Sequence, residues 1–267
     1  MYYTVLVKYF PYILDTIDAE DPMSSRPPSG LERLWSREEQ GRAPRLGLSL
    51  ERIVESGIEL ADGDGLEAVS MKRVAERLGF TTMALYRYVS SKDDLLLLMH
   101  DTAWRPSPGF DLPVDDWRDG IGRWTREQFA IMQRHPWLEE VRHIDRAGTP
   151  SQITWMDLGL RALSGTPMVE YQKIELLLLL SGYVFAQART AATATEGARQ
   201  GFFAVEQATE AFGELLRTIV DAGRFPALAK SVEGGGFAGG RPFPDFDFGL
   251  DLILDGVDCL IKRQSQG

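Results

Sequence analysis

The sequence has very little cysteine and no apolar run long enough to cross a membrane. Its single cysteine, Cys259, excludes an intrachain disulfide and a multi-cysteine metal cage. The longest dense apolar run, residues 174–185, contains Glu175 and falls short of the roughly 20 residues that span a bilayer. The apolar start carries one positive charge and a proline, and no small-residue cleavage site follows it, so we expect no signal peptide. We therefore predict a cytoplasmic protein with no membrane partner, and Met23 is a second candidate translation start.

The sequence also lacks the common signatures of catalysis and cofactor binding. It contains no nucleophile elbow, phosphate-binding loop or dinucleotide fingerprint, and we predict no cofactor. His135, Glu139 and His143 are spaced four residues apart, which is compatible with a metal site on one helix face. Pro136 begins that helix, however, and no second cluster of ligands supports the site. A helical enzyme with a metal at His135 and His143 is therefore the weaker alternative, and we predict no metal.

Positive charge is scarce overall but locally concentrated. The formal net charge is −10, which by itself argues against an anionic partner such as DNA. Residues 71–92 reverse this balance, with five basic side chains against one acidic side chain: Lys72, Arg73, Arg77, Arg87 and Lys92 against Glu76. An anionic partner is therefore expected at this segment.

The hydrophobic pattern is helical throughout. No segment alternates with period two for long enough to indicate a sheet, whereas spacings of three and four recur from Leu48 onward. We predict an all-α protein. After four helices within residues 50–103, further helices are expected at about 115–134, 136–146, 151–164, 167–189, 202–222 and 246–263. Linkers are expected at 191–197 and 231–242, which are rich in small residues.

The second and third helices have the pattern of a helix-turn-helix. Ser70 is a good N-cap for the second helix, and the third opens at Thr81 or Thr82 and runs to about Val89. Such a motif needs a small residue where the helices cross and a glycine at the turn, and Ala75 and Gly79 supply them. Apolar residues that fix the angle between the helices are Val74, Leu78, Phe80, Leu85 and Val89.

The remaining side chains of the third helix are expected to face outward. A recognition helix enters the DNA major groove with its N-terminal end, so Thr81, Thr82 and Met83 are placed to reach base edges. Arg87 can read guanine or bind phosphate, and the phenols of Tyr86 and Tyr88 can hold phosphates at the rim of the groove. A partly buried packing role is the alternative for Tyr88. The residues predicted to contact DNA are Arg45, Ser70, Lys72, Thr81, Thr82, Met83, Tyr86, Arg87, Tyr88 and Lys92, the last beside helix N-terminal amides that suit a phosphate.

These motifs together resemble the DNA-binding domain of the tetracycline-repressor (TetR) family. The resemblance rests on I-V-E-S-G-I-E-L-A-D-G-D-G-L-E-A-V-S-M-K-R-V-A-E-R-L-G and on T-T-M-A-L-Y-R-Y-V-S-S-K-D-D-L-L, within Ser49 to Leu96. Weaker similarity to the family's C-terminal domain lies in R-H-P-W-L at 134–138 and F-D-F-G-L-D-L-I-L-D-G at 246–256. Membership implies an N-terminal three-helix helix-turn-helix domain and a larger helical domain for ligand binding and dimerisation.

The expected domains are an N-terminal extension at 1–44, a helix-turn-helix domain at 45–96 and a helical ligand-binding and dimerisation domain at 97–267. The extension departs from the family pattern. In the segment before Leu48, Arg42 and Arg45 have the charge of an arm that contacts the DNA backbone or minor groove, and a solvated linker is the alternative.

Two helices carry the pattern of an interface between subunits. Phe246, Leu250, Ile253, Val257 and Leu260 step by four and three, which gives a narrow apolar seam. The stretch 174–185 is apolar around nearly its whole circumference and must be covered on more than one side. An intrachain core is the alternative to a homodimer. The predicted interface residues are Ile174, Leu178, Gly182, Phe185, Phe246, Leu250, Ile253, Val257 and Leu260.

The effector-binding residues are the least defined by the sequence. The candidates are aromatic and apolar side chains with one polar contact: Trp104, Phe129, Met132, Trp137, Trp155, Met156, Tyr183 and Gln187. Each is also a candidate for the core. We predict a small apolar or aromatic effector, double-stranded operator DNA and a second copy of the chain as partners. The predicted function is a repressor that binds a palindromic operator as a homodimer and is released by its effector; a DNA-binding activator without an effector is the alternative.

Overall fold

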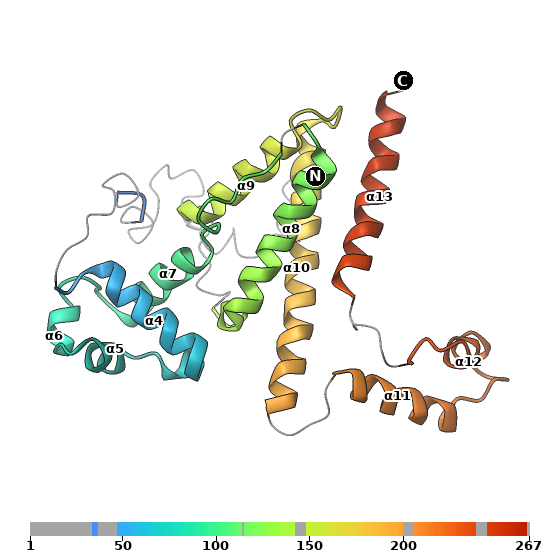
Figure 1. The fold of residues 1–267 in the computed structure, drawn as a ribbon, viewed down its shortest axis with the longest axis horizontal. Helices are drawn as coiled ribbons and strands as arrows, with labels where there is room; N and C mark the ends of the chain where they lie inside the picture. The colour runs from blue at the N-terminus through green and yellow to red at the C-terminus, as the bar shows by residue number, and fades with distance from the viewer. Residues whose placement is uncertain are drawn as a thin grey trace, which may run out of the picture. The chain divides into compact units, whose positions relative to one another are not determined.

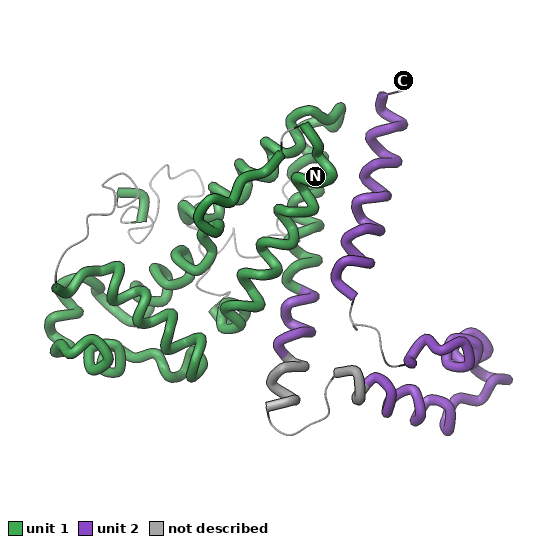
Figure 2. Tube along the Cα trace, in the orientation of Figure 1, with its two compact units in different colours: residues 1–185 green, residues 186–267 purple. Residues whose placement is uncertain are grey.

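The computed structural model describes residues 34–36, 47–113, 115–141, 148–199, 205–238 and 245–265. Every regular element within these ranges is a helix, which confirms the predicted all-α class (Figure 1). The chain divides into two compact units, residues 1–185 and 186–267 (Figure 2). The long helix α10, Glu170–Arg199, crosses from the first unit into the second.

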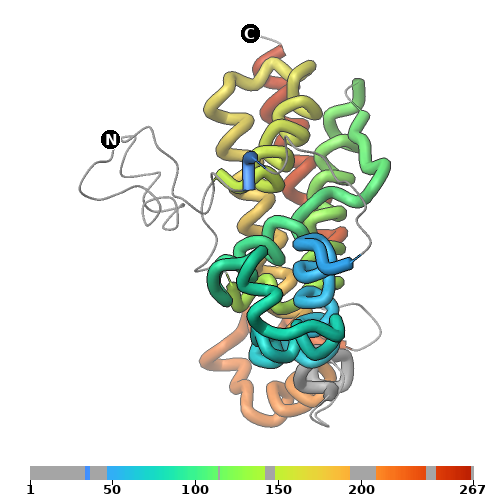
Figure 3. Tube along the Cα trace, turned by 90° about the vertical axis from the view of Figure 1, so that its left-hand side faces the viewer, coloured from blue at the N-terminus to red at the C-terminus, as the bar shows by residue number. Residues whose placement is uncertain are grey.

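The first unit begins with three α-helices that we call the N-terminal bundle. Its elements are α4 (Leu50–Asp64), the 3-10 helix η1 (Leu66–Ala68), α5 (Met71–Leu78) and α6 (Thr82–Leu85). Helix α4 packs against α5, and α5 packs against α6. Figure 3 turns the molecule so that these helices face the viewer.

Serine hydroxyls cap the starts of α4 and α5, and the cap at Ser70 is the one predicted above. The hydroxyl of Ser49 accepts from the amide of Arg52 at 3.3 Å, and the hydroxyl of Ser70 accepts from the amide of Arg73 at 3.2 Å. Each bond satisfies one of the amides that a helix start leaves unpaired. The predicted helix starts are therefore confirmed. The third helix is shorter than expected, because the chain leaves α6 after Leu85 and turns through residues 86–88.

Gly79 ends α5 in the left-handed region, with φ at 76°. A side chain at this φ is strained, so Gly79→Ala is expected to lower the free energy of unfolding by about 1–2 kcal/mol. Gly63 is the control, because it is an exposed residue of helix α4 where an added Cβ meets nothing within 4 Å. Gly63→Ala is expected to raise the free energy of unfolding by up to about 1 kcal/mol. Urea titration followed by circular dichroism measures both, and shifts of the same sign would contradict this reading of Gly79.

Helix α7, Lys92–Ala103, connects the N-terminal bundle to the rest of the first unit. Ser91 caps it by accepting from the amide of Asp94 at 3.0 Å. The seven consecutive residues from Leu95 to Asp101 are all buried, and α7 packs against both α4 and α9. The expected domain boundary at residue 96 thus falls inside a helix that is buried on all sides, and the division into functional domains stays a prediction.

The first unit continues with helices that pack around aromatic side chains. They are α8 (Trp117–Arg134), the 3-10 helix η2 (Pro136–Glu139), α9 (Pro150–Ala162) and the first half of α10. Helix α8 packs against α9. The helix expected at 136–146 is described only as η2 and the turn after it, since residues 142–147 lie outside the described ranges.

The second unit contains the end of α10, then α11 (Val205–Ile219), α12 (Pro226–Glu233) and α13 (Phe246–Ser265). Two linker predictions are corrected here. The stretch 191–197 is helical, because α10 continues to Arg199 through residues rich in alanine, the best helix former. The stretch 231–242 begins inside α12, which Pro226 starts at a position that suits proline.

Candidate nucleic-acid interface

Helices α5 and α6 are held as a rigid pair by their shared apolar side. Val74, Leu85 and Val89 have no exposed surface, and Ala75 is 1% exposed at the crossing. Phe80, also predicted to pack here, is 38% exposed. The pair has the arrangement of a helix-turn-helix, in which packing fixes the second helix at one angle to the first.

The outer side of α6 is open to solvent. Met83 is 73% exposed and Tyr86 47% exposed, and Thr81 and Arg87 are also exposed. Thr82 is half-buried. The hydroxyl of Thr81 accepts from the amide of Ala84 at 3.3 Å, which leaves its hydrogen available to an outside acceptor. The structure therefore brings most of the predicted base-contacting residues together on one accessible face.

The basic side chains of this region differ in their partners. Arg73 forms an ion pair with Asp64 at 2.6 Å, and Arg77 forms one with Glu59 at 2.8 Å. Lys72 lies 3.8 Å from Glu76. Arg87 and Lys92 are exposed, and neither has an ion-pair partner within 4 Å among the residues that the structure describes. Arg87 is thus the cation of this surface best placed for a phosphate or a base.

Three predicted contacts look different in the structure. Tyr88 is half-buried, and its hydroxyl donates to the carbonyl of Leu48 at 2.9 Å, an arrangement that favours the packing alternative. The hydroxyl of Ser70 is engaged as a helix cap. Beside Lys92, the carboxylate of Asp94 accepts from the amide of Ser90 at 2.8 Å, which places negative charge where a phosphate was expected. Arg45 lies outside the described residues.

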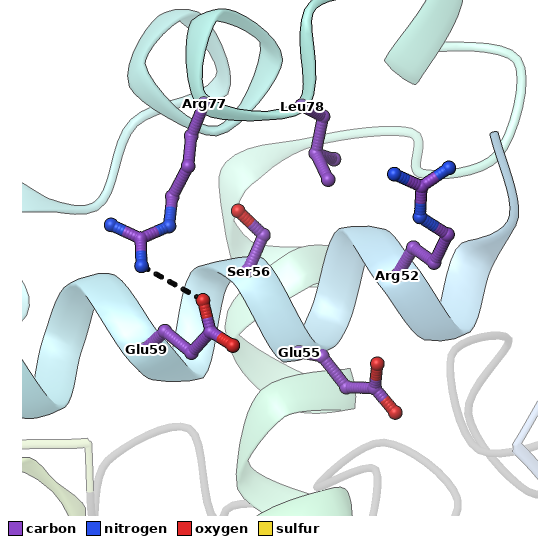
Figure 4. A pocket seen from close by; sticks show the side chains of 6 residues that line it. All are labelled: Arg52, Glu55, Ser56, Glu59, Arg77 and Leu78. Atoms are coloured by element: carbon purple, nitrogen blue, oxygen red, sulfur yellow. Dashed lines mark hydrogen bonds and ion pairs between the residues drawn. The ribbon is translucent and has the colours of Figure 1, made fainter.

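A hollow of about 190 Å³ lies between α4 and α5 (Figure 4). Its lining is largely charged, and three of its four charged side chains have partners: Arg77 pairs with Glu59, and Arg52 donates to the carbonyl of Gly47 at 2.6 Å. This lining does not match the apolar effector pocket that the sequence predicts. The remaining lining residues are Glu55, Ser56 and Leu78.

Trp155 is at the centre of the buried aromatic cluster beyond α7. Its Nε1 donates to the carbonyl of Trp104 at 2.6 Å, and its own carbonyl accepts from Nε1 of Trp124 at 2.8 Å. Its ring lies 5.4 Å from Phe110 and 6.1 Å from Trp124. Trp104 in turn lies 5.9 Å from Phe185. The cluster contains three aromatic residues that were not predicted in it: Trp124, Phe110 and Phe185. The sequence signal that could have identified Trp124 is its helical spacing from Ile121 and Gln128 on α8.

The predicted effector-binding residues do not share one environment. Four of them are buried: Trp104, Met132, Trp137 and Trp155. The indole nitrogens of Trp137 and Trp155 donate to partners inside the protein. Met156 is 38% exposed on α9. Residues that are half-buried, and so remain candidates for contact with an effector, are Phe129, Tyr183 and Gln187.

Trp137 is better explained as a structural contact than as a lining residue. It is 2% exposed, and its Nε1 donates to Oδ1 of Asp62 at 2.7 Å. His135, a ligand of the metal site considered as the weaker alternative, has its Nδ1 2.8 Å from the same oxygen. His143 lies outside the described residues. Among the residues that are described, no three His, Cys, Asp or Glu side chains are grouped to hold a metal ion.

The predicted subunit interface falls on two helices with partly exposed apolar faces. On α13, Leu250 and Val257 are already buried in the single chain, which corrects their prediction as interface residues. The other predicted residues of this helix are half-buried: Phe246, Ile253 and Leu260. The exposed apolar residues of α13 are Phe248 at 63% and Leu252 at 58%. On α10, Ile174, Leu178 and Phe185 are half-buried and Gly182 is exposed. Leu179 and Tyr171, which were not predicted, are 57% and 61% exposed.

No helix in the described part of the chain is long and apolar enough to span a membrane.

The fold and the exposed outer face of α6 define a helix-turn-helix transcription regulator with a helical C-terminal region. Residues 53–99 match the model described as bacterial regulatory proteins, tetR family, and residues 108–261 match the tetracyclin repressor-like C-terminal domain. The chain belongs to the TetR family of transcriptional regulators, which are not enzymes.

Similar proteins agree with this assignment. The HTH-type transcriptional repressor DrrR1 of Streptomyces coeruleorubidus is 34% identical over 236 residues, which cover 88% of this chain and 86% of that protein. The apo structure of ActR from Streptomyces coelicolor has a TM-score of 0.67 at 22% identity and covers 84% of this chain and 99% of that one. ActR in complex with actinorhodin has a TM-score of 0.66 at 23% identity, with 80% and 98% covered. The two ActR structures show a shared fold.

Proposed function

We propose that this protein is a cytoplasmic, ligand-responsive repressor that binds a palindromic operator as a homodimer and leaves it when a small aromatic effector binds. The observation that carries the proposal is the exposed face of α6 on a rigidly packed helix pair, with Met83, Tyr86 and Arg87 open to solvent. A recognition helix must present such a face to the major groove. Repression, rather than activation, is favoured by the name of the relative DrrR1.

The effector class is inferred from two features. The region beyond α7 is rich in buried aromatic side chains, including Trp104, Trp124 and Trp155. The neighbour ActR has been solved with actinorhodin bound. We place the effector against the half-buried Phe129 and Tyr183, which both belong to the first unit.

The proposed mechanism depends on the distance between two recognition helices. In a two-fold dimer they must lie about 34 Å apart to read adjacent half-sites on one face of the duplex. An effector that prefers a form with another separation lowers DNA affinity, and DNA lowers effector affinity by the same factor. Helix α7 transmits the change, because it packs against the bundle helix α4 and against α9.

The homodimer is proposed to use the exposed faces of α10 and α13. Tyr171, Leu179 and Gly182 share one face of α10, and Phe248 and Leu252 share one face of α13. Large exposed apolar side chains in such a row indicate a surface that a partner covers. A small residue such as Gly182 lets a partner helix approach closely.

Footprinting on the DNA that flanks the gene tests the function. We expect protection of a two-fold symmetric sequence, and loss of protection when an aromatic effector is added. Protection that increases gene expression in a reporter assay would favour an activator. Absence of any protected sequence would contradict the proposal.

Arg87→Ala is expected to lower operator affinity by roughly 5- to 150-fold, the range for loss of one good base or phosphate contact. The matched control is Arg123→Ala on α8, which removes the same charge from another exposed arginine. Fluorescence anisotropy with the footprinted duplex, repeated at several salt concentrations, measures both. If Arg87 contacts a phosphate, the plot of log affinity against log salt concentration should have a slope smaller by about one in the variant. If Arg87 contacts a guanine, the variant should lose specificity at one base pair. Equal affinities for the two variants would contradict a role for Arg87.

A further inference from the structure

One carboxylate oxygen joins the N-terminal bundle to the helices beyond α7. Oδ1 of Asp62, in the last turn of α4, lies 2.8 Å from Nδ1 of His135 and 2.7 Å from Nε1 of Trp137. A carboxylate only accepts, so both ring nitrogens donate to it. The two donors are 73 and 75 residues away in sequence. They follow α8 directly, where Pro136 begins η2.

The position of Asp62 is unfavourable unless these donors are present. The C-terminal end of a helix carries partial negative charge, which disfavours a carboxylate. The nearby Asp64 is compensated within the bundle by its ion pair with Arg73. The negative charge of Asp62 is stabilised instead by two donors outside the bundle. The side chain of His135 is 12% exposed, and Trp137 is almost fully buried.

The donors are rigidly attached to the proposed effector-binding region. His135 caps the C-terminal end of α8, and its amide donates to the carbonyl of Ile131 at 2.9 Å. Phe129 and Met132 lie on the last turns of the same helix. A displacement of this end of α8 therefore moves both donors relative to Asp62.

We propose that Asp62 is a positioning residue that holds the N-terminal bundle in one orientation on the effector-binding region through its bonds to His135 and Trp137. The inference rests on the proposed function, in which that orientation sets the separation of the two recognition helices. The bundle is connected to this region covalently through α7, and the bonds of Asp62 add a second connection through His135 and Trp137. Loss of the Asp62 bonds leaves the connection through α7 in place.

Asp62→Ala tests the proposal, with Asp64→Ala as the matched control. Both variants remove one negative charge from the end of α4, but only the first breaks the link to His135 and Trp137. We expect Asp62→Ala to lower affinity for the footprinted operator by roughly 2- to 30-fold, the range seen for residues that couple distant sites. In differential scanning calorimetry, we expect the bundle of Asp62→Ala to unfold in a separate, earlier transition, and Asp64→Ala to retain a single one.

A second pair of variants separates positioning from mere stability. Trp137→Phe keeps most of the ring and removes one donor, and its effect on operator affinity is expected to disappear in an Asp62→Ala background, because coupled residues are not additive. Asp62→Asn retains an acceptor oxygen and is expected to keep most of the operator affinity. If Asp62→Ala does not fold, Asp62→Asn and Trp137→Phe are compared instead. Unchanged or higher affinity in Asp62→Ala, or additive effects in the double variant, would overturn the proposal. If the wild-type protein binds no flanking DNA, the proposed function fails, and the calorimetric comparison alone decides whether the link exists.

Discussion

Replacement of Trp155 by alanine is expected to lower the free energy of unfolding by about 3–5 kcal/mol, the range for deleting a large buried aromatic side chain. The side chain is 4% exposed and contacts Phe110 and Trp124 through its ring. Its Nε1 also donates to the carbonyl of Trp104, so the substitution removes a hydrogen bond as well as packing. Urea unfolding followed by far-ultraviolet circular dichroism measures the loss.

Met156→Ala is the control for this prediction. Met156 is the next residue on α9 but is 38% exposed, so its replacement is expected to cost less than about 1 kcal/mol. Trp155→Phe keeps an aromatic ring in the cluster and removes the indole donor. It is expected to lower the free energy of unfolding by about 1–3 kcal/mol, because the hydrogen bond and part of the side-chain volume are lost. Equal losses at positions 155 and 156 would show that Trp155 is not the centre of the core.

Replacement of Leu179 by aspartate is expected to convert the proposed dimer into a monomer and to lower operator affinity at least a hundredfold, about 2.8 kcal/mol. Leu179 is 57% exposed in the single chain, so the substitution leaves the fold of the chain nearly unchanged. In a two-fold interface each residue occurs twice, and two unpaired charges would be buried together. Sedimentation velocity and anisotropy with the operator duplex measure the two effects.

Ile153→Asp is the matched control for Leu179→Asp. Ile153 is an exposed aliphatic residue at 41%, on α9 rather than α10. The same charge introduced there is expected to leave the dimer and the operator affinity intact. A dimer that survives Leu179→Asp with full affinity would exclude this face of α10 from the interface.

The N-terminal bundle was predictable because its signals are local in the sequence. Ser49 and Ser70 cap helices that begin within one residue of them, and Gly79 turns the chain between two adjacent helices. The outward side of α6 follows from the same periodicity. Tyr88 is the exception, because its hydrogen bond to Leu48 spans 40 residues and has no local signal.

The rest of the candidate site depends on contacts that no local pattern encodes. The periodicity of α13 identified an apolar seam, but it did not show that Leu250 and Val257 are covered by the chain itself. The link from Asp62 to Trp137 joins residues 75 positions apart. Trp104, Trp137 and Trp155 were recognised by residue type, and Trp124 was missed. The choice between core and effector contact is decided by the direction of each ring, which composition does not give.

The burial of the middle of α7 determines how the protein is expected to respond to its effector. A helix packed on every side from Leu95 to Asp101 cannot rotate or slide by small increments without overlapping its neighbours, because protein interiors are as dense as crystals. We therefore expect α7 to move only between discrete arrangements of its packed side chains. A weak inducer at saturation is therefore expected to give a mixture of fully released and fully bound molecules, visible as two populations in single-molecule measurements, and not one population of intermediate affinity.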